Sequence, residues 1–507
     1  MPPTAPPPID KVDPARAWQP WEPGARDPFN LKWAGHLFRR AGFSANLSEM
    51  RAAVEKGLEA TLTRLLDGEE GAEAREQLLL TVGDKMVSDD KPEGLRGWWC
   101  YCMIHTAHPL REKMTVFWHN HFATSIAKVV RPTLMYAQNK LLRRHALGKF
   151  RPFLLEVSRD PAMIVWLDNN ANVKGQPNEN YAREIMELFS LGVGNYTEQD
   201  IKEAARAFTG WHTSDSGDAY EFNAREHDDG PKTVLGQSGK WNGDDVVRIL
   251  LDQPQAARFL VRKLYRYFIS EPHEPPAALL EPLAESFRKN DYDVAALMKT
   301  MLRSRHFFSD YAYRQRLKSP VEFVLGAARA VVHPTEDQET VRLPPGPLVN
   351  RMAAMGQELF TPPNVKGWPH GKAWLNTSTV LARNNFAQHV AFGRIAEEVY
   401  DDGSFNTSVP VPPPPGTPAP PPPEVPEGPA PPAVYDPADL VRQAKLTEPA
   451  KVVDFLLDLF LQGDAPAPAR TKLVAFVAQG KPKDKSLDRR VREAAHTIMC
   501  MPEYQLA

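Results

Sequence analysis

The stretch PNENYAREIMELFSLGVGNYTEQDIKEAARAFTGW, residues 177–211, predicts two helices joined by a short turn. Apolar residues recur at helical spacing over 180–191, and Gly192 follows where a helix-terminating glycine is expected. Thr197 opens the second helix as an N-cap, with a run of good helix formers behind it. The alternation of helix and punctuated turn predicts a helical fold for this part of the chain.

The same pattern continues over most of the region from Pro28 to about Tyr400. Ser319-Pro320-Val321-Glu322, for example, is a capping box with proline at the first helical position. Residues 209–242 break the pattern, because AYEFNA and KTVLGQ are typical of short strands around a turn. We therefore expect a mainly α fold: a large multi-helix, orthogonal or bundle-like domain with a small β-hairpin excursion and a proline-rich insertion.

The 49 prolines divide the chain, because many of them lie at the N-terminus and in VPPPPGTPAPPPPEVPEGPAPP at 411–432. Such a run favours polyproline II and acts as a spacer. The predicted regions are a proline-rich N-terminal arm at 1–27, a main helical domain at 28–400, a proline-rich disordered spacer at 401–436, and C-terminal helices at 437–507. We expect the last region to dock on the main domain; a separate module is the alternative.

Composition narrows the classes of function. The 507 residues carry a formal net charge of -2, so no basic excess points to nucleic acid. Three cysteines are too few for a disulfide framework. No apolar run has the length of a transmembrane span, and the N-terminus lacks the pattern of a signal peptide. A cytoplasmic location is therefore expected, with export alongside a partner left open.

Two glutamates lie on the helix expected at 180–191. At about 100° per residue, Glu184 falls inside the apolar face and Glu187 at its margin. A carboxylate facing an apolar surface must be paired, hydrogen-bonded or bound to a cation, and its raised pKa suits acid–base catalysis. The alternative is a structural ion pair with a nearby arginine such as Arg183, Arg206 or Arg262.

Two histidines occur in FWHNHFATS, residues 117–125. His121 shares a predicted helix face with apolar residues, whereas His119 points to the opposite side, so the two converge on one ligand only if the helix ends near Asn120. The alternative for His121 is a hydrogen-bonded core histidine. We take His121, Glu184 and Glu187 as catalytic candidates, and His119, His121, Glu184, Glu187 and His227 as candidate ligands of a divalent metal ion.

His227 enters this set through the turn His227-Asp228-Asp229-Gly230, which equally suits a self-capping turn. Binding candidates come from two other places. Asp168 and Asn180 are polar residues beside helix ends, where they serve as caps or bind hydroxyl-rich ligands. Trp368, Lys372 and Trp374 lie in a long irregular loop, where the tryptophans either stack on a sugar or pin the loop by burial.

The stretches FWHNHFATS, 177–211 and PPNVKGWPHGKAWLNTSTVLARNNF (362–386) resemble the bacterial family catalogued as domain of unknown function 1800. The resemblance extends over nearly the whole chain outside its proline-rich parts. It implies no established activity and no catalytic residues. Members are often encoded beside a secreted protein similar to sulfatases and alkaline phosphatases, so the resemblance implies such a protein as a partner.

Three functions remain open from the sequence. The first is a metal-assisted enzyme with a site between helices, acting on an envelope-related or polymeric substrate. The second is a non-enzymatic binding or escort protein for the sulfatase- or phosphatase-like partner, and the third is a structural scaffold. P-loop, zincin, α/β-hydrolase and dinucleotide-binding signatures are all missing from the sequence. We place the enzyme first, because ionisable groups face inward on two predicted helices.

Overall fold

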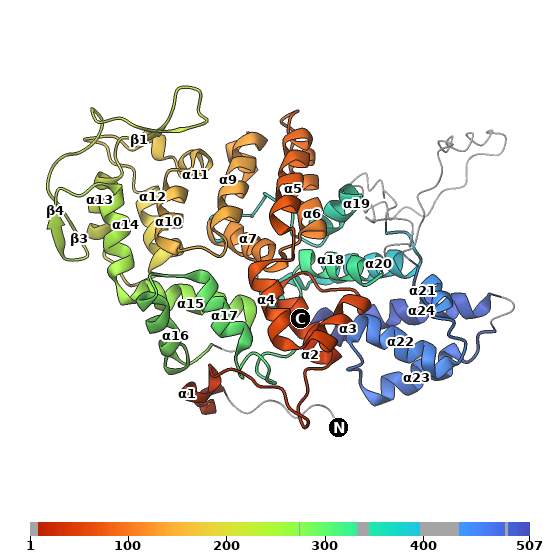
Figure 1. The fold of residues 1–507 in the computed structure, drawn as a ribbon. Coiled ribbons are helices and arrows are strands. Elements are labelled where there is room, and N and C mark those ends of the chain that lie inside the picture. The colour runs from red at the N-terminus through yellow and green to blue at the C-terminus, as the bar shows by residue number, and fades with distance from the viewer. Residues whose placement is uncertain (1–8, 273, 332–343, 396–435, 482–484) are drawn as a thin grey trace, which may run out of the picture.

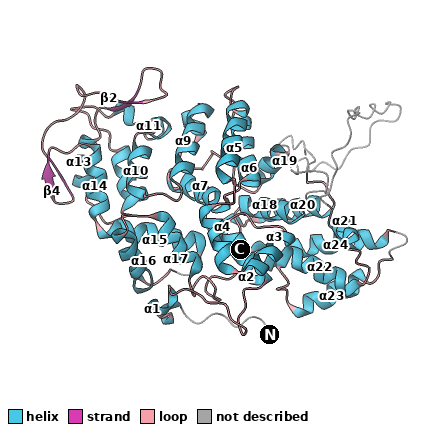
Figure 2. Cartoon of the chain, in the orientation of Figure 1, coloured by secondary structure: helices cyan, strands magenta, loops and turns pink. Residues whose placement is uncertain are grey.

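The computed structural model describes residues 9–272, 274–331, 344–395, 436–481 and 485–507. Helices dominate these residues, as Figures 1 and 2 show, and the expected mainly α fold is confirmed. In chain order the helices, with η marking 3-10 and π segments, are η1 (Ile9–Lys11), α1 (Pro14–Ala17), α2 (Leu31–Ala41), α3 (Leu47–Lys56), α4 (Leu58–Asp67), α5 (Ala72–Met86), α6 (Pro92–His105), α7 (Pro109–His121), α8 (Ile126–Val129), α9 (Pro132–His145), α10 (Phe150–Ser158), α11 (Pro161–Trp166), η2 (Asn169–Ala171), α12 (Asn180–Glu184), η3 (Ile185–Ser190), α13 (Glu198–Ala207), α14 (Gly243–Asp252), α15 (Pro254–Phe268), α16 (Ala277–Lys289), α17 (Val294–Arg303), α18 (Pro320–Val331), α19 (Pro345–Ala354), η4 (Gly371–Trp374), α20 (Thr377–Ala391), α21 (Pro437–Gln443), α22 (Pro449–Leu461), α23 (Ala467–Val477), α24 (Ser486–Cys500) and α25 (Pro502–Gln505).

The predicted helix punctuation is confirmed where contacts test it. Thr197 accepts a hydrogen bond from the backbone N–H of Asp200, and the Asp200 carboxylate accepts one from the backbone N–H of Thr197. Ser319 and Glu322 cap α18 in the same reciprocal way. Gly192 ends the preceding helix with φ +83°, a conformation that glycine adopts without strain.

The β excursion consists of two hairpins rather than one. β1 (Trp211–Thr213) pairs with β2 (Tyr220–Phe222), and β3 (Lys232–Val234) pairs with β4 (Gln237–Gly239), both antiparallel. The two segments expected as strands therefore belong to different sheets. The reason lies at Leu235 and Gly236, whose positive φ values form a tight two-residue turn that folds β4 back on β3.

One hydrophobic core extends from Ala17 to Tyr504, and α7 runs through it. Polar residues of α7 are buried together with its apolar residues, and the two charged ones have charge partners: Glu112 binds Arg143, and Lys113 binds Glu322. Because α7 is enclosed on all sides, both of its helical faces meet protein. This position brings the end of α7 to the centre of the molecule, where the candidate site lies.

The C-terminal helices share this core. α24 packs against α20, and α22 packs against α18. Leu506 bridges to Leu317, and the backbone N–H of Lys318 donates to the carbonyl of Gln505. Figure 1 shows α21 to α24 (blue) on the side of the molecule occupied by α18 and α20. The expected spacer at 401–436 lies, apart from residue 436, outside the described residues.

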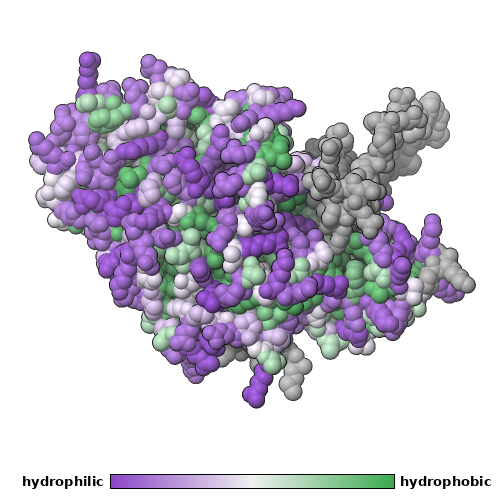
Figure 3. Space-filling view, viewed as in Figure 1, coloured by the Kyte–Doolittle hydropathy of each residue, from purple (hydrophilic) through white to green (hydrophobic). Residues whose placement is uncertain are grey.

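The surface is mainly hydrophilic on the face drawn in Figure 3, with hydrophobic residues in scattered small groups. Within the described ranges, no helix combines the length and apolar character that a membrane crossing requires.

Candidate active site

A cavity of about 930 Å³ opens between α7, η3, α15 and the loop at 364–374. Its size lies in the range of small-molecule sites. Its lining contains both apolar and ionisable side chains. The contributing residues include Phe117, Asn120, His121, Glu187, Leu188, Leu191, Phe259, Arg262, Lys263, Arg266, Tyr267, Glu271, Leu280, Lys366 and His370. Of the residues predicted from the sequence, the structure brings His121 and Glu187 together in this lining.

The loop at 364–374 is fastened to the end of α7. The Asn120 side-chain oxygen accepts a hydrogen bond of 2.6 Å from the backbone N–H of Trp368. Gly367 adopts φ +85°, and a Cβ added there would lie 2.2 Å from the Asn120 side-chain oxygen. The ring of His119 stacks on Trp368, with centroids 5.2 Å apart. The stretches FWHNHFATS and NVKGWPHGKAW, far apart in sequence, thus form one wall of the cavity.

The opposite wall contains a π-helix. The expected helix at 180–191 is α-helical only over α12 and then widens into η3, where the backbone N–H of Leu191 donates to the carbonyl of Met186. The wider turn changes the angle between successive side chains, so the α-helical spacing misplaces the two glutamates. Glu187, expected at the margin, lines the cavity; Glu184, expected inside the face, is half-buried and outside the lining.

The alternative expected for Glu184, an ion pair with Arg183, Arg206 or Arg262, does not form among the described residues. Arg183 binds Glu179 and Glu198, while Arg206 and Arg262 bind Asp228 and Glu274. No hydrogen bond or ion pair joins Glu184 to any residue that the structure describes. Burial and the neighbouring Glu187 raise the pKa of Glu184, against the opposing charges of Arg183 and Lys366.

Glu187 accepts a hydrogen bond of 2.8 Å from the hydroxyl of Tyr196.

The end of the π-helix fixes the tautomer of His121. Its Nε2 lies 3.1 Å from the carbonyl oxygen of Phe189, so Nε2 carries the proton and donates it. The other ring nitrogen, Nδ1, is buried without a hydrogen-bond partner among the described residues and keeps its lone pair. Burial, and then the charge of Lys263, lowers the pKa of His121 well below the usual range, so the ring is neutral. The prediction of an inward His121 is confirmed.

Lys263 is the cavity residue that the sequence analysis missed. Its Nζ lies 3.5 Å from the carbonyl oxygen of Leu188, at the carboxyl end of the same π-helix, and 5.3 Å from the ring centre of Phe259. The arginines of α15 pair with carboxylates of the next segment, but no ion pair joins Lys263 to a described carboxylate. Burial lowers the pKa of Lys263 to about 7.

His119 does not share a site with His121. It was expected on the face away from the core, yet it is buried against Trp99, Phe360 and Trp368 because α7 is enclosed on both sides. Both ring nitrogens lack hydrogen-bond partners among the described residues. In the part of the chain that the structure describes, no three or more His, Cys, Asp or Glu side chains gather to hold a metal ion, so the five metal candidates are not brought together.

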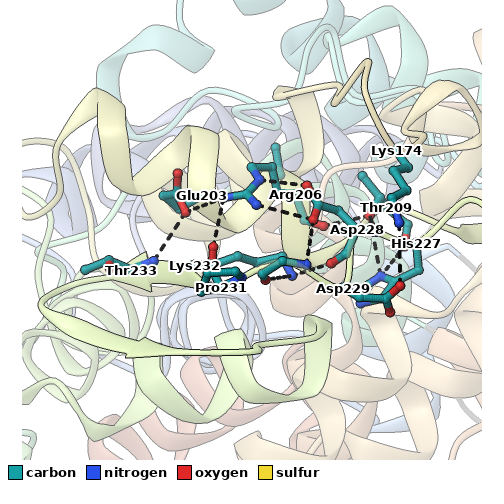
Figure 4. Close-up of polar contacts among 12 residues, drawn as sticks. Lys174, Glu203, Arg206, Thr209, His227, Asp228, Asp229, Pro231, Lys232 and Thr233 are labelled. Atoms are coloured by element: carbon teal, nitrogen blue, oxygen red, sulfur yellow. Dashed lines mark hydrogen bonds and ion pairs between the residues drawn. The ribbon is translucent and has the colours of Figure 1, made fainter.

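His227 belongs to a turn held by its own hydrogen bonds, drawn in Figure 4. Its Nδ1 lies 2.9 Å from the carbonyl oxygen of Thr209. Asp228 accepts hydrogen bonds from Arg206 and from the backbone N–H of Gly230. These contacts match the self-capping alternative.

The binding candidates form two separate groups. Asp168 accepts a hydrogen bond from Asn180 and pairs with Lys128, so its carboxylate is engaged within the protein. Trp368 and Trp374 are only 3% and 4% exposed and pack with Leu317 and Leu506 in a small apolar cluster. Their faces are therefore unavailable for stacking on a sugar, and the alternative of a loop pinned by buried tryptophans describes them. Lys372 is exposed.

The fold and site define a mainly helical protein with a cavity of about 930 Å³ lined by neutral and charged ionisable groups. The chain belongs to the family described as "Protein of unknown function (DUF1800)", whose model matches residues 36–506. No curated protein and no solved structure matches the chain significantly.

Proposed function

We propose that the chain is an enzyme whose active site is the cavity between α7, η3 and α15, with Lys263 as its acid–base group. The observation that supports the proposal is the Lys263 amine, which lines the cavity without a carboxylate partner among the described residues. Its pKa of about 7 keeps both protonation states populated near neutral pH. Such an amine accepts a proton from a substrate and returns it in a later step.

The neighbouring groups suit this role. His121 contributes a neutral ring to the lining, and Glu187 adds a carboxylate to it. At the loop, Lys366 is exposed and has no ion pair with a described carboxylate, so its ammonium group is available to an anionic substituent of the substrate. The envelope-related or polymeric substrate expected from the sequence stays a prediction; within that class, the cleft favours an acidic portion.

The metal-assisted form of the enzyme is not carried into this proposal. Its five candidate ligands lie in four places: His121 and Glu187 in the cavity lining, Glu184 outside that lining, His119 in an aromatic enclosure and His227 in the β2–β3 connection. The proposal therefore uses the protein's own amine. Binding to a sulfatase- or phosphatase-like partner stays a prediction.

The test is untargeted detection of a reaction. A metabolite extract of the cells that encode the chain is incubated with the wild type, Lys263→Met and Lys299→Met, and its composition is followed by mass spectrometry. Lys299 is an exposed lysine on α17 and serves as the matched control. We expect a compound consumed by the wild type and Lys299→Met but not by Lys263→Met. Consumption at equal rates by all three proteins would remove Lys263 from the mechanism.

A further inference from the structure

Resting on this proposed function, we infer that Lys263 forms an imine with a carbonyl compound that carries a carboxylate or phosphate group. The inference goes beyond proton transfer, because it assigns a covalent step and a class of substrate. Three features of the cavity support the inference: the hydrogen bond of the Lys263 amine, the side chains around it, and the positive charge of Lys366.

The amine is placed as a nucleophile. Its one hydrogen-bond partner among the described residues is the carbonyl oxygen of Leu188, at 3.5 Å. A carbonyl oxygen accepts an N–H and leaves the nitrogen lone pair of a neutral amine free, whereas a carboxylate would hold the group as an ammonium ion. The amine lies over the ring of Phe259, and Leu188 and Leu191 add further apolar side chains to the same lining. A lysine desolvated in this way is an activated nucleophile.

The charged and titratable groups that line the cavity around the amine come from every neighbouring element. They are His121 on α7, Glu187 on η3, Arg258, Arg262, Arg266 and Tyr267 on α15, Glu271 and Glu274 after α15, Glu281 on α16, and Lys366 and His370 on the loop. Arg258 pairs with Glu281. Arg262 and Arg266 both contact Glu274, and Glu271 contacts Arg316. Lys366 is thus the cavity cation, besides Lys263, without an ion pair to a described residue.

Formation of the imine releases one molecule of water. The amine nitrogen attacks the carbonyl carbon, the C–N bond forms, and the carbonyl oxygen takes up one proton that leaves the nitrogen, giving a carbinolamine. Loss of the second N–H proton and of the hydroxyl group as water leaves the C=N bond, so the carbonyl oxygen and both amine protons depart together. Glu187, in the same lining, is a carboxylate that can carry the protons, and the carbonyl oxygen of Leu188 accepts an N–H of the amine.

The anionic substituent follows from the position of Lys366. Lys366 belongs to the loop that contacts the end of α7 through Asn120 and Gly367. The backbone of Lys366 is therefore held beside the cavity that its side chain lines. A carboxylate or phosphate on the carbonyl compound pairs with this ammonium group while the carbonyl carbon meets Lys263. A neutral carbonyl compound of the same shape lacks the ion pair and binds more weakly.

The experiment traps the imine in the full-length protein at pH 7. The protein is incubated with 4-formylbenzoate or with benzaldehyde, reduced with sodium cyanoborohydride, and mapped by peptide mass spectrometry. An ordinary exposed lysine is neutral in about 1 of 2,500 molecules at pH 7, whereas an amine with a pKa of about 7 is neutral in about half of them. We expect Lys263 to be modified at least tenfold faster than the exposed Lys299 of the same molecules.

The Lys366→Met variant tests the class of substrate. In the wild type, Lys263 should react several-fold faster with 4-formylbenzoate than with benzaldehyde, and the variant should lose this preference while still reacting with benzaldehyde. Modification of Lys263 no faster than Lys299, or spread over lysines in proportion to exposure, overturns the inference. If Lys263 is not trapped but remains essential for metabolite consumption, the imine falls and the proposed active site stands; if it is neither trapped nor essential, both fall.

Discussion

Gly367→Ala should destabilise the protein far more than Gly175→Ala, although both glycines have nearly the same backbone conformation. Gly367 has φ +85° and Gly175 has φ +84°. A non-glycine residue in this region costs about 1 kcal/mol or somewhat more at either position. At Gly175 an added Cβ meets nothing within 4 Å, so this strain is the whole expected effect.

At Gly367 the added Cβ would lie 2.2 Å from the side-chain oxygen of Asn120 and 2.5 Å from its carbonyl oxygen. The loop must move away from α7, which breaks the 2.6 Å hydrogen bond from the Trp368 backbone N–H to Asn120. This hydrogen bond is part-buried, and leaving a buried donor without its acceptor costs about 1–3 kcal/mol. The expected total is therefore about 3 kcal/mol, which is about 2 kcal/mol more than at Gly175.

Urea unfolding followed by tryptophan fluorescence measures both variants against the wild type. The expected difference of about 2 kcal/mol in free energy of unfolding is several times the error of comparing two urea transitions that have the same m value. Equal losses of about 1 kcal/mol for the two variants would refute the account, because they would mean that the 364–374 loop does not rest on the end of α7. The cavity wall built from these two segments would then be wrong.

Two further predictions concern buried carboxyl groups. Burial alone would raise the pKa of Glu322, but Arg316 and Lys113 hold it well below its usual range. Glu322→Gln should therefore lose about 3–5 kcal/mol of stability at neutral pH. This loss should shrink as the pH falls below about 4, where the unfolded carboxyl takes up a proton; a loss independent of pH in urea titrations would contradict the ion pairing. Burial raises the pKa of Asp160 to about 7, against hydrogen bonds from Met163 N–H and Gln138. The native state then binds the extra proton between about pH 4 and 7, so stability from this group falls as pH rises, by up to about 1.4 kcal/mol per pH unit. Asp160→Asn should flatten that slope, and urea midpoints with the same pH dependence in both proteins would count against the raised pKa.

The sequence predicts the helices well because their ends carry local signals. Thr197, Gly192 and Ser319 act at the positions where their capping chemistry places them. Those signals depend on contacts within a few residues, which the chain itself supplies. The strand segments near Tyr220 and Thr233 are also correct, but their partners are not, because pairing depends on a turn at Leu235 and Gly236 that the alternation of residues does not reveal.

The site is harder to predict because it depends on hydrogen-bond register and tertiary enclosure. The π-helix leaves no periodic signature in 180–191, so the spacing does not predict that Glu187, rather than Glu184, lines the cavity. His119 is buried because other helices surround α7, which its own spacing does not show. Lys263 did leave a signal: at about 100° per residue it lies about 60° from Leu260 at the edge of the apolar face of α15, whereas the arginines of that helix lie on the other side.

The most direct test of the central claim is the titration of the Lys263 amine in the folded protein. Trace acetylation with acetic anhydride across pH 5–11, quantified by peptide mass spectrometry against the exposed Lys299, gives the pH at which the amine becomes reactive. The account predicts a midpoint of about 7 for Lys263. A midpoint near the ordinary lysine value of about 10.4 would contradict it, because the cavity would then hold a permanently charged ammonium group without the acid–base or nucleophilic role proposed for it.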